Sequence, residues 1–279
     1  MADSTKPLAV GGSAPVPSRP SEQGRWVHFD RYWLLLIGAL IIAAFLFFAF
    51  PDKYQPIFRY VFGTPADGDG VFMTLKLTAI SFVCILVVGM IMGVMRVSNV
   101  GILKGIASLY VEIVRGVPVL VWILWIYFGL PVLFRDGLGF KNMRIAGFPA
   151  AVVAFTFAFG AYMTEIFRAG IQSIPKGQME ASRSLGMNYL QAMRHIILPQ
   201  AVRVILPPVS NEFVTLLKDS SLVSVLGLED VTRRGREWVG RTFASFDTYL
   251  VVALIYLILT VFFTRVSSAM ERRLSVEKR

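Results

Sequence analysis

The chain has 279 residues, a mean hydropathy of +0.62 and a formal net charge of +10, with 28 Lys and Arg against 18 Asp and Glu. Hydrophobic residues make up 55% and charged residues 16%, whereas soluble domains carry about 25% charged residues. This composition predicts an all-α integral membrane protein and excludes disordered, collagen-like and disulfide-stapled proteins and most soluble enzymes. The basic excess fits contact with the lipid bilayer rather than with nucleic acid, because no basic run is interleaved with stacking aromatic residues.

Residues 1–32 differ from the rest of the chain because Pro, Ser, Gly and charged residues dominate them. Such a segment cannot bury enough apolar surface to fold, so we expect a disordered tail. The first apolar run, residues 33–50, is almost long enough to span a bilayer. Its end, Phe50-Pro51-Asp52, lacks the small residues of a signal-peptide cleavage site, so we predict a retained N-terminal helix.

Four further apolar runs, at 71–95, 117–134, 148–166 and 249–266, each approach the roughly 20 residues that a spanning helix needs. A sixth segment, 202–226, is too polar to face lipid. Polar groups are tolerated at bilayer depth where they face protein or a watery cavity. The sequence therefore predicts about six transmembrane helices. The fifth is expected to line a polar cavity, with a backbone opened by Pro207 and Pro208.

The gap between residues 168 and 203 has its own pattern. Helix-forming residues surround Glu180, Gly186 is expected to end a short helix, and Asn188 can cap the next one. Apolar residues then recur three and four positions apart before Pro199 closes the second helix, at Leu190, Met193 and Ile197. From periodicity alone, this pair of helices fits either a partner's groove or a headgroup surface.

At these residues the chain resembles the membrane permease subunits of ATP-binding-cassette importers. The motif of that family is E-A-A-x3-G-x9-I-x-L-P. It matches here with one departure, serine for the second alanine, at Glu180, Ala181, Ser182, Gly186, Ile196, Leu198 and Pro199. Flanking segments narrow the resemblance to the polar amino-acid branch, the histidine, glutamine and glutamate-type permeases: 112–118, 126–131, 161–168 and 216–222. The resemblance covers residues 70–273 and leaves the tail and the 33–50 helix outside.

The resemblance implies a coupling loop at residues 175–200 that docks on ATP-binding cassette ATPase subunits in the cytosol. Both termini would then be cytoplasmic, in the bacterial cytoplasmic (inner) membrane. The segment 233–241 would be an outer loop that meets an extracytoplasmic amino-acid-binding protein. It also implies a second permease subunit, either the same or a related chain. Glu180 would either pair with the ATPase or cap its own helix.

No phosphate-binding G-x-x-x-x-G-K-[ST] loop occurs in the chain. By the resemblance, ATP and Mg²⁺ belong to the partner ATPase. We expect no catalytic residue, metal site or cofactor on this chain. With two histidines and one cysteine, no nucleophile–base or metal constellation for an intramembrane enzyme assembles.

A polar amino acid carries an ammonium and a carboxylate, and both need partners in a low-dielectric path. The expected pathway residues combine the fifth helix with flanking positions: Asn211, Glu212, Lys218, Asp219, Ser220, Ser221, Glu112, Arg115, Tyr127 and Glu165. Two of these carboxylates have an arginine three residues further on, which predicts the local ion pairs Glu112–Arg115 and Glu165–Arg168. Tyr127 would face either the cavity or lipid.

Two smaller features concern helix packing. Gly89 and Gly93 form a G-x-x-x-G pair that favours close contact with another helix, within the subunit rather than between subunits. Pro118 is expected to start or kink its helix.

The leading hypothesis is thus a binding-protein-dependent permease driven by ATP hydrolysis on another subunit. The alternative is a secondary transporter of small polar solutes driven by an ion gradient. That class usually shows repeated halves, and the chain has no internal repeat.

Overall fold

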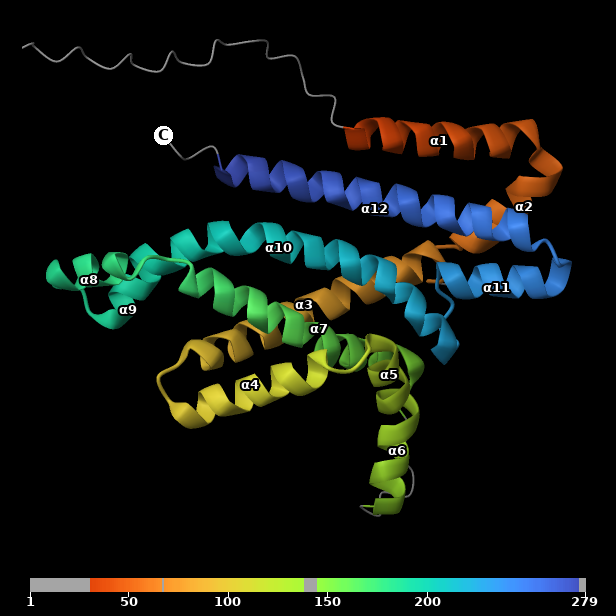
Figure 1. Cartoon of the computed structure of the whole chain (residues 1–279). Helices are drawn as coiled ribbons and strands as arrows, with labels where there is room; N and C mark the ends of the chain where they lie inside the picture. Colours follow the sequence, from red (N-terminus) through yellow and green to blue (C-terminus); the bar gives the residue numbers. More distant parts are fainter. Residues whose placement is uncertain (1–30, 67, 138–144, 276–279) are drawn as a thin grey trace, which may run out of the picture.

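A computed structural model describes residues 31–66, 68–137 and 145–275, and this part of the chain is built from helices and short connections (Figure 1). Residues 1–30 of the expected tail lie outside the described residues. In chain order the helices are α1 (Arg31–Ala49), α2 (Pro51–Phe62), α3 (Val71–Val97), α4 (Gly101–Arg115), α5 (Val119–Leu124), α6 (Leu130–Val132), α7 (Gly147–Gln172), α8 (Lys176–Ser184), α9 (Tyr189–Ala192), α10 (Leu198–Asp219), α11 (Val231–Thr242) and α12 (Ser245–Ser275).

Three π-helical turns and a 3-10 helix extend these elements. A π-helical turn at Trp125–Gly129 joins α5 to α6, and another at Leu133–Gly137 extends α6. The resulting continuous helix starts directly after Pro118, one of the two expected roles of this proline. A third π-helical turn, Met193–Ile197, joins α9 to α10, and the 3-10 helix Ser220–Leu226 continues α10.

The all-α membrane architecture is confirmed. Within the described ranges, four helices are long and apolar enough to cross a bilayer: α3, the α5–α6 helix, α7 and α12. They correspond to four of the six predicted segments. The segment predicted at 33–50 forms a shorter apolar helix, Trp33–Ala49. The sixth is α10, which is more polar than these and begins four residues before the predicted start.

The expected effects of three prolines were wrong. The chain is helical without a break from Tyr189 to Leu226, so Pro199 does not close a helix, and Pro207 and Pro208 do not open one. Pro199 follows the wider π-helical turn and sits in the first turn of α10, where a proline ring is tolerated. Pro207 and Pro208 remove backbone donors but keep a helical φ, which packing within a helical bundle can accommodate.

The loop conformation expected for residues 233–241 is also wrong, because these residues form helix α11. The Asp230 side chain accepts hydrogen bonds from the backbone N–H groups of Thr232 (3.1 Å) and Arg233 (3.0 Å) and so caps α11. Arg233 then pairs with Glu237 one turn further on at 2.7 Å. The Asp230 cap and the Arg233–Glu237 ion pair stabilise this helix, which could not be predicted from the number of charged residues in the segment.

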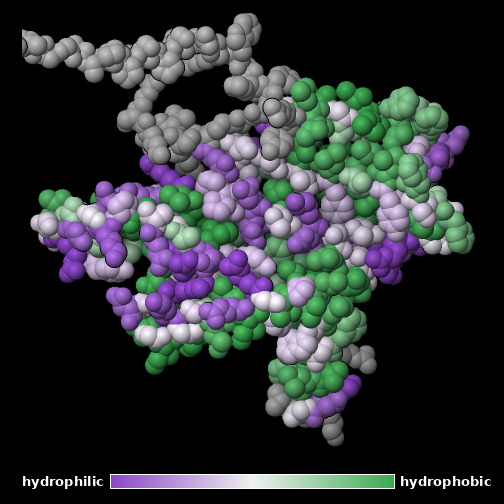
Figure 2. Space-filling view, viewed as in Figure 1, coloured by the Kyte–Doolittle hydropathy of each residue, from purple (hydrophilic) through white to green (hydrophobic). Residues whose placement is uncertain are grey.

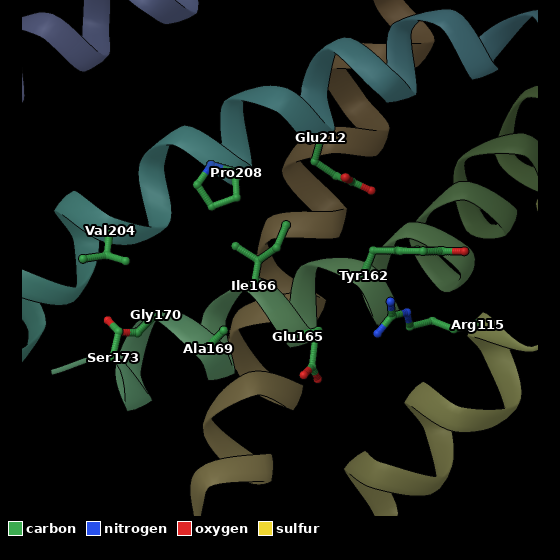
Figure 3. Close-up of a pocket in the computed structure, with 10 residues that line it drawn as sticks. All are labelled: Arg115, Tyr162, Glu165, Ile166, Ala169, Gly170, Ser173, Val204, Pro208 and Glu212. Atoms are coloured by element: carbon green, nitrogen blue, oxygen red, sulfur yellow. The ribbon is translucent and has the colours of Figure 1, made fainter.

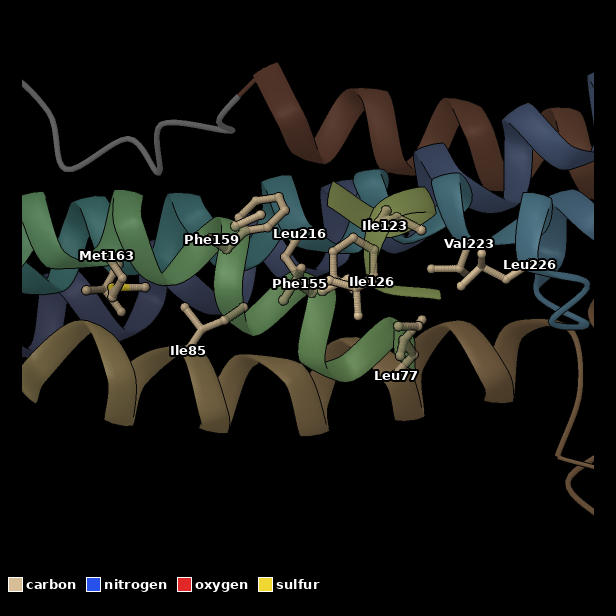
Figure 4. Packing of buried hydrophobic residues seen from close by; sticks show 14 of the residues in the cluster. Leu77, Ile85, Ile123, Ile126, Phe155, Phe159, Met163, Leu216, Val223 and Leu226 are labelled. Carbon is tan, nitrogen blue, oxygen red and sulfur yellow. The ribbon is translucent and has the colours of Figure 1, made fainter. Parts of the chain in front are cut away.

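The hydrophobic core is centred on α7, which packs most extensively against α3 (Figure 4). Its fully buried side chains come from α3, α5, α7, α10 and the 3-10 helix, and include Leu77, Ile85, Ile123, Phe155, Met163, Leu216 and Val223. A second buried cluster joins α2, α3, α11 and α12.

The glycine pair lies at the close contact between α3 and α7. A Cβ atom on Gly89 would lie 2.4 Å from Cγ of Met163, and one on Gly93 would lie 2.7 Å from Cβ of Phe167. Both neighbours belong to α7 of the same chain. The predicted packing within the subunit is therefore confirmed.

Gly89→Leu is expected to destabilise the protein by about 2–3 kcal/mol, because the added side chain must displace Met163 from a closely packed helix contact. The matched control is Gly105→Leu, since a Cβ there would meet no atom within 4 Å. Thermal unfolding of the purified protein in detergent compares the two. Equal melting temperatures for both variants would contradict the close α3–α7 packing.

Helices α1 and α12 lie side by side and run in opposite directions. Near the start of α1 the Trp33 ring faces the Arg265 guanidinium at 5.7 Å, and just beyond its end the Tyr54 hydroxyl donates to Asp247 at 2.8 Å. Helices α8 and α9 occupy one end of the bundle, and α2 and α11 occupy the other (Figure 1). Hydrophilic residues gather around α8 and α9, whereas apolar residues dominate the surface of α1 (Figure 2).

Candidate functional site: a coupling segment and a charged cavity

The segment between α7 and α10 forms two short helices, as predicted. Gly186 follows α8 with φ +84°, a left-handed conformation that glycine adopts without strain. Asn188 caps α9: its side chain accepts from the Gln191 N–H, and the Gln191 side chain accepts from the Asn188 N–H, both at 2.9 Å. The chain thus reverses tightly between α8 and α9.

The tip of this segment exposes apolar side chains. Leu185 is 81% exposed and Leu190 is 74% exposed, which is unusual for leucines outside a contact surface. Ser182, the residue that departs from the family motif, is buried and donates to the carbonyl of Gln178 at 2.6 Å, so the hydroxyl is accommodated locally. Glu180 is exposed and forms no ion pair within the described residues.

The remaining motif residues occupy the α8–α10 connection. Ala181 is exposed on α8, Ile196 is half-buried in the π-helical turn, and Leu198 and Pro199 are exposed at the start of α10. The motif residues therefore lie on α8, the π-helical turn and the start of α10, and α8 and α9 occupy one end of the bundle (Figure 1).

A cavity of about 500 Å³ lies where α4, α7 and α10 converge (Figure 3). Its lining combines small and apolar residues with three charged groups: Arg115, Tyr162, Glu165, Ile166, Ala169, Gly170, Ser173, Val204, Pro208 and Glu212. The cavity reaches from the end of α4 toward the start of the coupling segment, because Ser173 follows the last turn of α7.

Glu165 is held by two arginines. The predicted Glu165–Arg168 pair is confirmed, with Nε of Arg168 at 2.9 Å from Oε1, and Arg96 of α3 contributes a second contact of 2.5 Å. Arg96 is a residue that sequence reasoning missed, because it lies 69 positions away. The Glu165 charge is therefore compensated within the protein, and the cluster ties α3 to α7.

Arg115 contacts the Tyr162 ring instead of forming the expected ion pair with Glu112. Its guanidinium lies 5.0 Å from the centre of the Tyr162 ring and projects between Tyr162 and Glu165 (Figure 3). The expected pair with Glu112 is not formed, and Glu112 is exposed. Cation–π contact with Tyr162 holds the arginine at the cavity without neutralising it.

Glu212 projects from α10 into the same cavity, one turn after Pro208 and facing the Tyr162 side (Figure 3). Within the described ranges, neither Glu212 nor Arg115 has an ion-pair partner within 4.0 Å. The cavity thus presents one acidic and one basic group that are both available to a ligand.

The other expected pathway residues lie elsewhere. Asn211 and Lys218 are exposed, Asp219 and Ser221 are half-buried, and Ser220 is buried with its hydroxyl donating to the carbonyl of Leu217 at 2.7 Å. Tyr127 packs against the main core. None of these six residues lines the described cavity. Tyr162 and Ser173 do line it, although they were not predicted from the sequence as pathway residues.

Glu165→Gln is expected to lower the stability of the protein by about 2 kcal/mol, because it leaves Arg96 and Arg168 facing each other without a countercharge in a half-buried site. The control is Glu180→Gln, an exposed carboxylate without an ion pair in the described part of the chain. Melting temperatures of both variants in detergent provide the test. An unchanged melting temperature for Glu165→Gln would show that the cluster does not support the fold.

Comparison with known proteins identifies the family. Residues 85–276 match the family described as binding-protein-dependent transport system inner membrane component. The chain belongs to this family. It is 39% identical over 206 residues to the probable glutamine ABC transporter permease protein GlnM of Bacillus subtilis (strain 168), covering 74% of this chain and 92% of the relative.

Two further proteins extend the similarity. The glutamine transport system permease protein GlnP of Escherichia coli (strain K12) is 36% identical over 208 residues, covering 75% of this chain and 92% of GlnP. The crystal structure of an amino acid ABC transporter with histidines contains a chain that is 40% identical, with a TM-score of 0.69, covering 81% of this chain and 98% of that one. The expected membership of the permease family and the multi-pass membrane architecture are therefore confirmed.

Proposed function

We propose that this chain forms the path by which a polar amino acid crosses the membrane in an ATP-driven importer. The observation that carries the proposal is the cavity between α4, α7 and α10, where Arg115 and Glu212 offer opposite charges without partners in the described protein. The family, and relatives named for glutamine transport, support a solute of this kind.

The charges match the chemistry of an amino acid. A guanidinium donates two parallel hydrogen bonds to a carboxylate, and a carboxylate accepts from an ammonium group. Arg115 and Glu212 would take these two roles. Glu165 would instead hold the wall of the cavity, because two arginines already compensate it. Further along α10, Lys218, Asp219 and Ser221 would continue the path, together with Asn211 and Ser220.

The coupling segment would transmit the energy of ATP hydrolysis from the ATPase subunit to the transport path. Helices α8 and α9, with the exposed Leu185 and Leu190, would dock in the ATPase subunit that binds ATP and Mg²⁺. A second permease subunit, the same or a related chain, would complete the path. The binding protein would approach the opposite end, near α2 and α11. Both termini would then lie in the cytosol, which is supported by α1 beginning and α12 ending toward the coupling end (Figure 1).

Reconstituted transport tests the proposal. The chain is co-expressed with its candidate ATPase and binding protein, reconstituted into liposomes and assayed with radiolabelled amino acids. We expect uptake that requires ATP on the ATPase side and persists when a protonophore collapses the proton gradient. Uptake that needs no ATP and stops with the protonophore would instead identify an ion-driven transporter.

A further inference from the structure

A second cavity lies at the end of the bundle opposite the coupling segment. It has a volume of about 490 Å³ and is lined by Phe47, Phe58, Arg59, Phe62, Gly63 and Thr64. It lies between the end of α1 and the length of α2, outside the charged cavity described above. Three of its six lining residues are phenylalanines, and Arg59 is the one charged residue among them.

Contacts within the α1–α2 hairpin fix the shape of this cavity. The Phe47 and Phe58 rings meet edge to face with their centres 5.9 Å apart, and the Gln55 side chain donates to the carbonyl of Phe47 at 3.3 Å. At the other end, Gly63 turns the chain with φ +78°, where a Cβ atom would lie 2.3 Å from Asp69. The cavity is therefore a built feature of the hairpin.

Arg59 is the charged residue of this cavity, and it differs from three other cationic residues at this end of the bundle in having no ion pair among the described residues. At the same end of the bundle, Lys53 pairs with Asp247 at 2.9 Å, Arg233 pairs with Glu237, and Arg234 pairs with Asp69. Arg59 is exposed and has no carboxylate within 4.0 Å among the described residues. Its positive charge is available to an anion.

An exposed apolar strip leads away from the cavity along α1. Ile41, Phe45 and Phe48 are 61%, 60% and 76% exposed, and their spacing of four and three residues puts them on one face of the helix. The Phe48 ring lies 5.3 Å from that of Phe47, which lines the cavity. At 1.5 Å per residue the strip is about 10 Å long.

We propose that this cavity binds an anionic phospholipid. The phosphate would accept hydrogen bonds from the Arg59 guanidinium, and the acyl chains would lie against Phe47, Phe58 and the exposed strip of α1. The combination favours a lipid over a free anion, because an aromatic cavity open to a membrane-facing helix adds apolar burial to the charge contact. It favours a lipid over a soluble protein because the strip belongs to an apolar helix, Trp33–Ala49, whose composition suits contact with hydrocarbon.

Native mass spectrometry of the detergent-purified complex tests this proposal. The complex is titrated with phosphatidylglycerol and, separately, with zwitterionic phosphatidylethanolamine. We expect tighter retention of phosphatidylglycerol, and retention about fivefold to tenfold weaker in the Arg59→Gln variant, as the loss of one arginine near a headgroup predicts. Arg59→Lys should restore part of the binding. Arg135→Gln, which removes another exposed arginine, should change nothing.

Three results would overturn the proposal. Equal retention of phosphatidylglycerol by the wild type and Arg59→Gln would show that the arginine does not bind the headgroup. Equal retention of both lipids by the wild type would remove the charge selectivity. Unchanged lipid retention combined with weaker stimulation of ATP hydrolysis by the binding protein would assign Arg59 to a protein contact. Because lipid retention is measured without transport, a failure here leaves the transport proposal intact.

Discussion

Gly186→Asp is expected to abolish ATP-dependent uptake while leaving the permease folded. Gly186 has φ +84°, and a Cβ atom there would meet no other atom within 4 Å. The folding cost is therefore limited to the left-handed conformation, about 1–2 kcal/mol. The new carboxylate, however, would lie at the reversal between α8 and α9, where we propose that the ATPase docks. Hydrolysis would then no longer be transmitted to the transport path.

The matched control is Gly186→Asn, which has the same shape, adopts left-handed conformations readily and carries no charge. Uptake and ATP hydrolysis are measured together in proteoliposomes, and circular dichroism reports on folding. We expect hydrolysis without uptake for the aspartate variant and substantial uptake for the asparagine variant. Normal uptake by Gly186→Asp would contradict the assignment of this segment as the coupling element.

Glu212→Gln is expected to lower the uptake efficiency for the amino acid by about tenfold or more. The carboxylate has no ion-pair partner in the described protein, so its proposed role is to accept from the ammonium group of the substrate. A hydrogen bond to a charged group contributes about 1.5–3 kcal/mol, which corresponds to that factor. Kinetics of uptake in proteoliposomes, over a range of substrate concentrations, provide the measurement.

Two further variants sharpen this test. Glu112→Gln makes the same substitution at an exposed carboxylate outside the cavity and should leave uptake unchanged. Asp219→Ala lies further along α10, also outside the cavity lining, and its effect reports whether the path extends that far. If Glu212→Gln transported as well as Glu112→Gln, the described cavity would not be the substrate site.

The features that the sequence predicted well are those encoded by neighbouring residues. Four spanning helices follow from long apolar runs, and the two short helices around Gly186 follow from a glycine and an asparagine cap. The Glu165–Arg168 pair follows from a spacing of three residues. Each signal comes from residues that are close together in the sequence, so it can be recognised without knowledge of the packing.

Helices α4 and α11 show where this reasoning stops. Both are short and amphipathic, so neither produces an apolar run of membrane length. Arg234 of α11 is neutralised by Asp69, 165 residues earlier, and its guanidinium lies 4.1 Å from the centre of the Tyr60 ring. Only the folded arrangement of α2, α3 and α11 supplies these partners. From the sequence alone, residues 233–241 were therefore predicted to be a charged loop.

The candidate cavity was predictable in part. Glu165, Arg115 and Glu212 were chosen from the sequence, and all three line it. The partners of these residues were not predictable: Arg96 reaches Glu165 from another helix, and Arg115 turns to Tyr162 rather than to its neighbour Glu112. A spacing along one helix identifies which contacts are possible, but the crossing of α3, α4 and α7 decides which of them form.

The unbroken helix from Tyr189 to Leu226 has a mechanical consequence. Glu212 lies 14 residues after Leu198, which is about 21 Å along a rigid axis. If α10 moves as one rigid body, a tilt of about 10° applied at the end next to the coupling segment would swing the Glu212 carboxylate by about 4 Å. Under the proposed coupling role, α10 would then act as a lever arm that converts a small rotation at the coupling segment into a displacement of a whole side-chain width at the cavity.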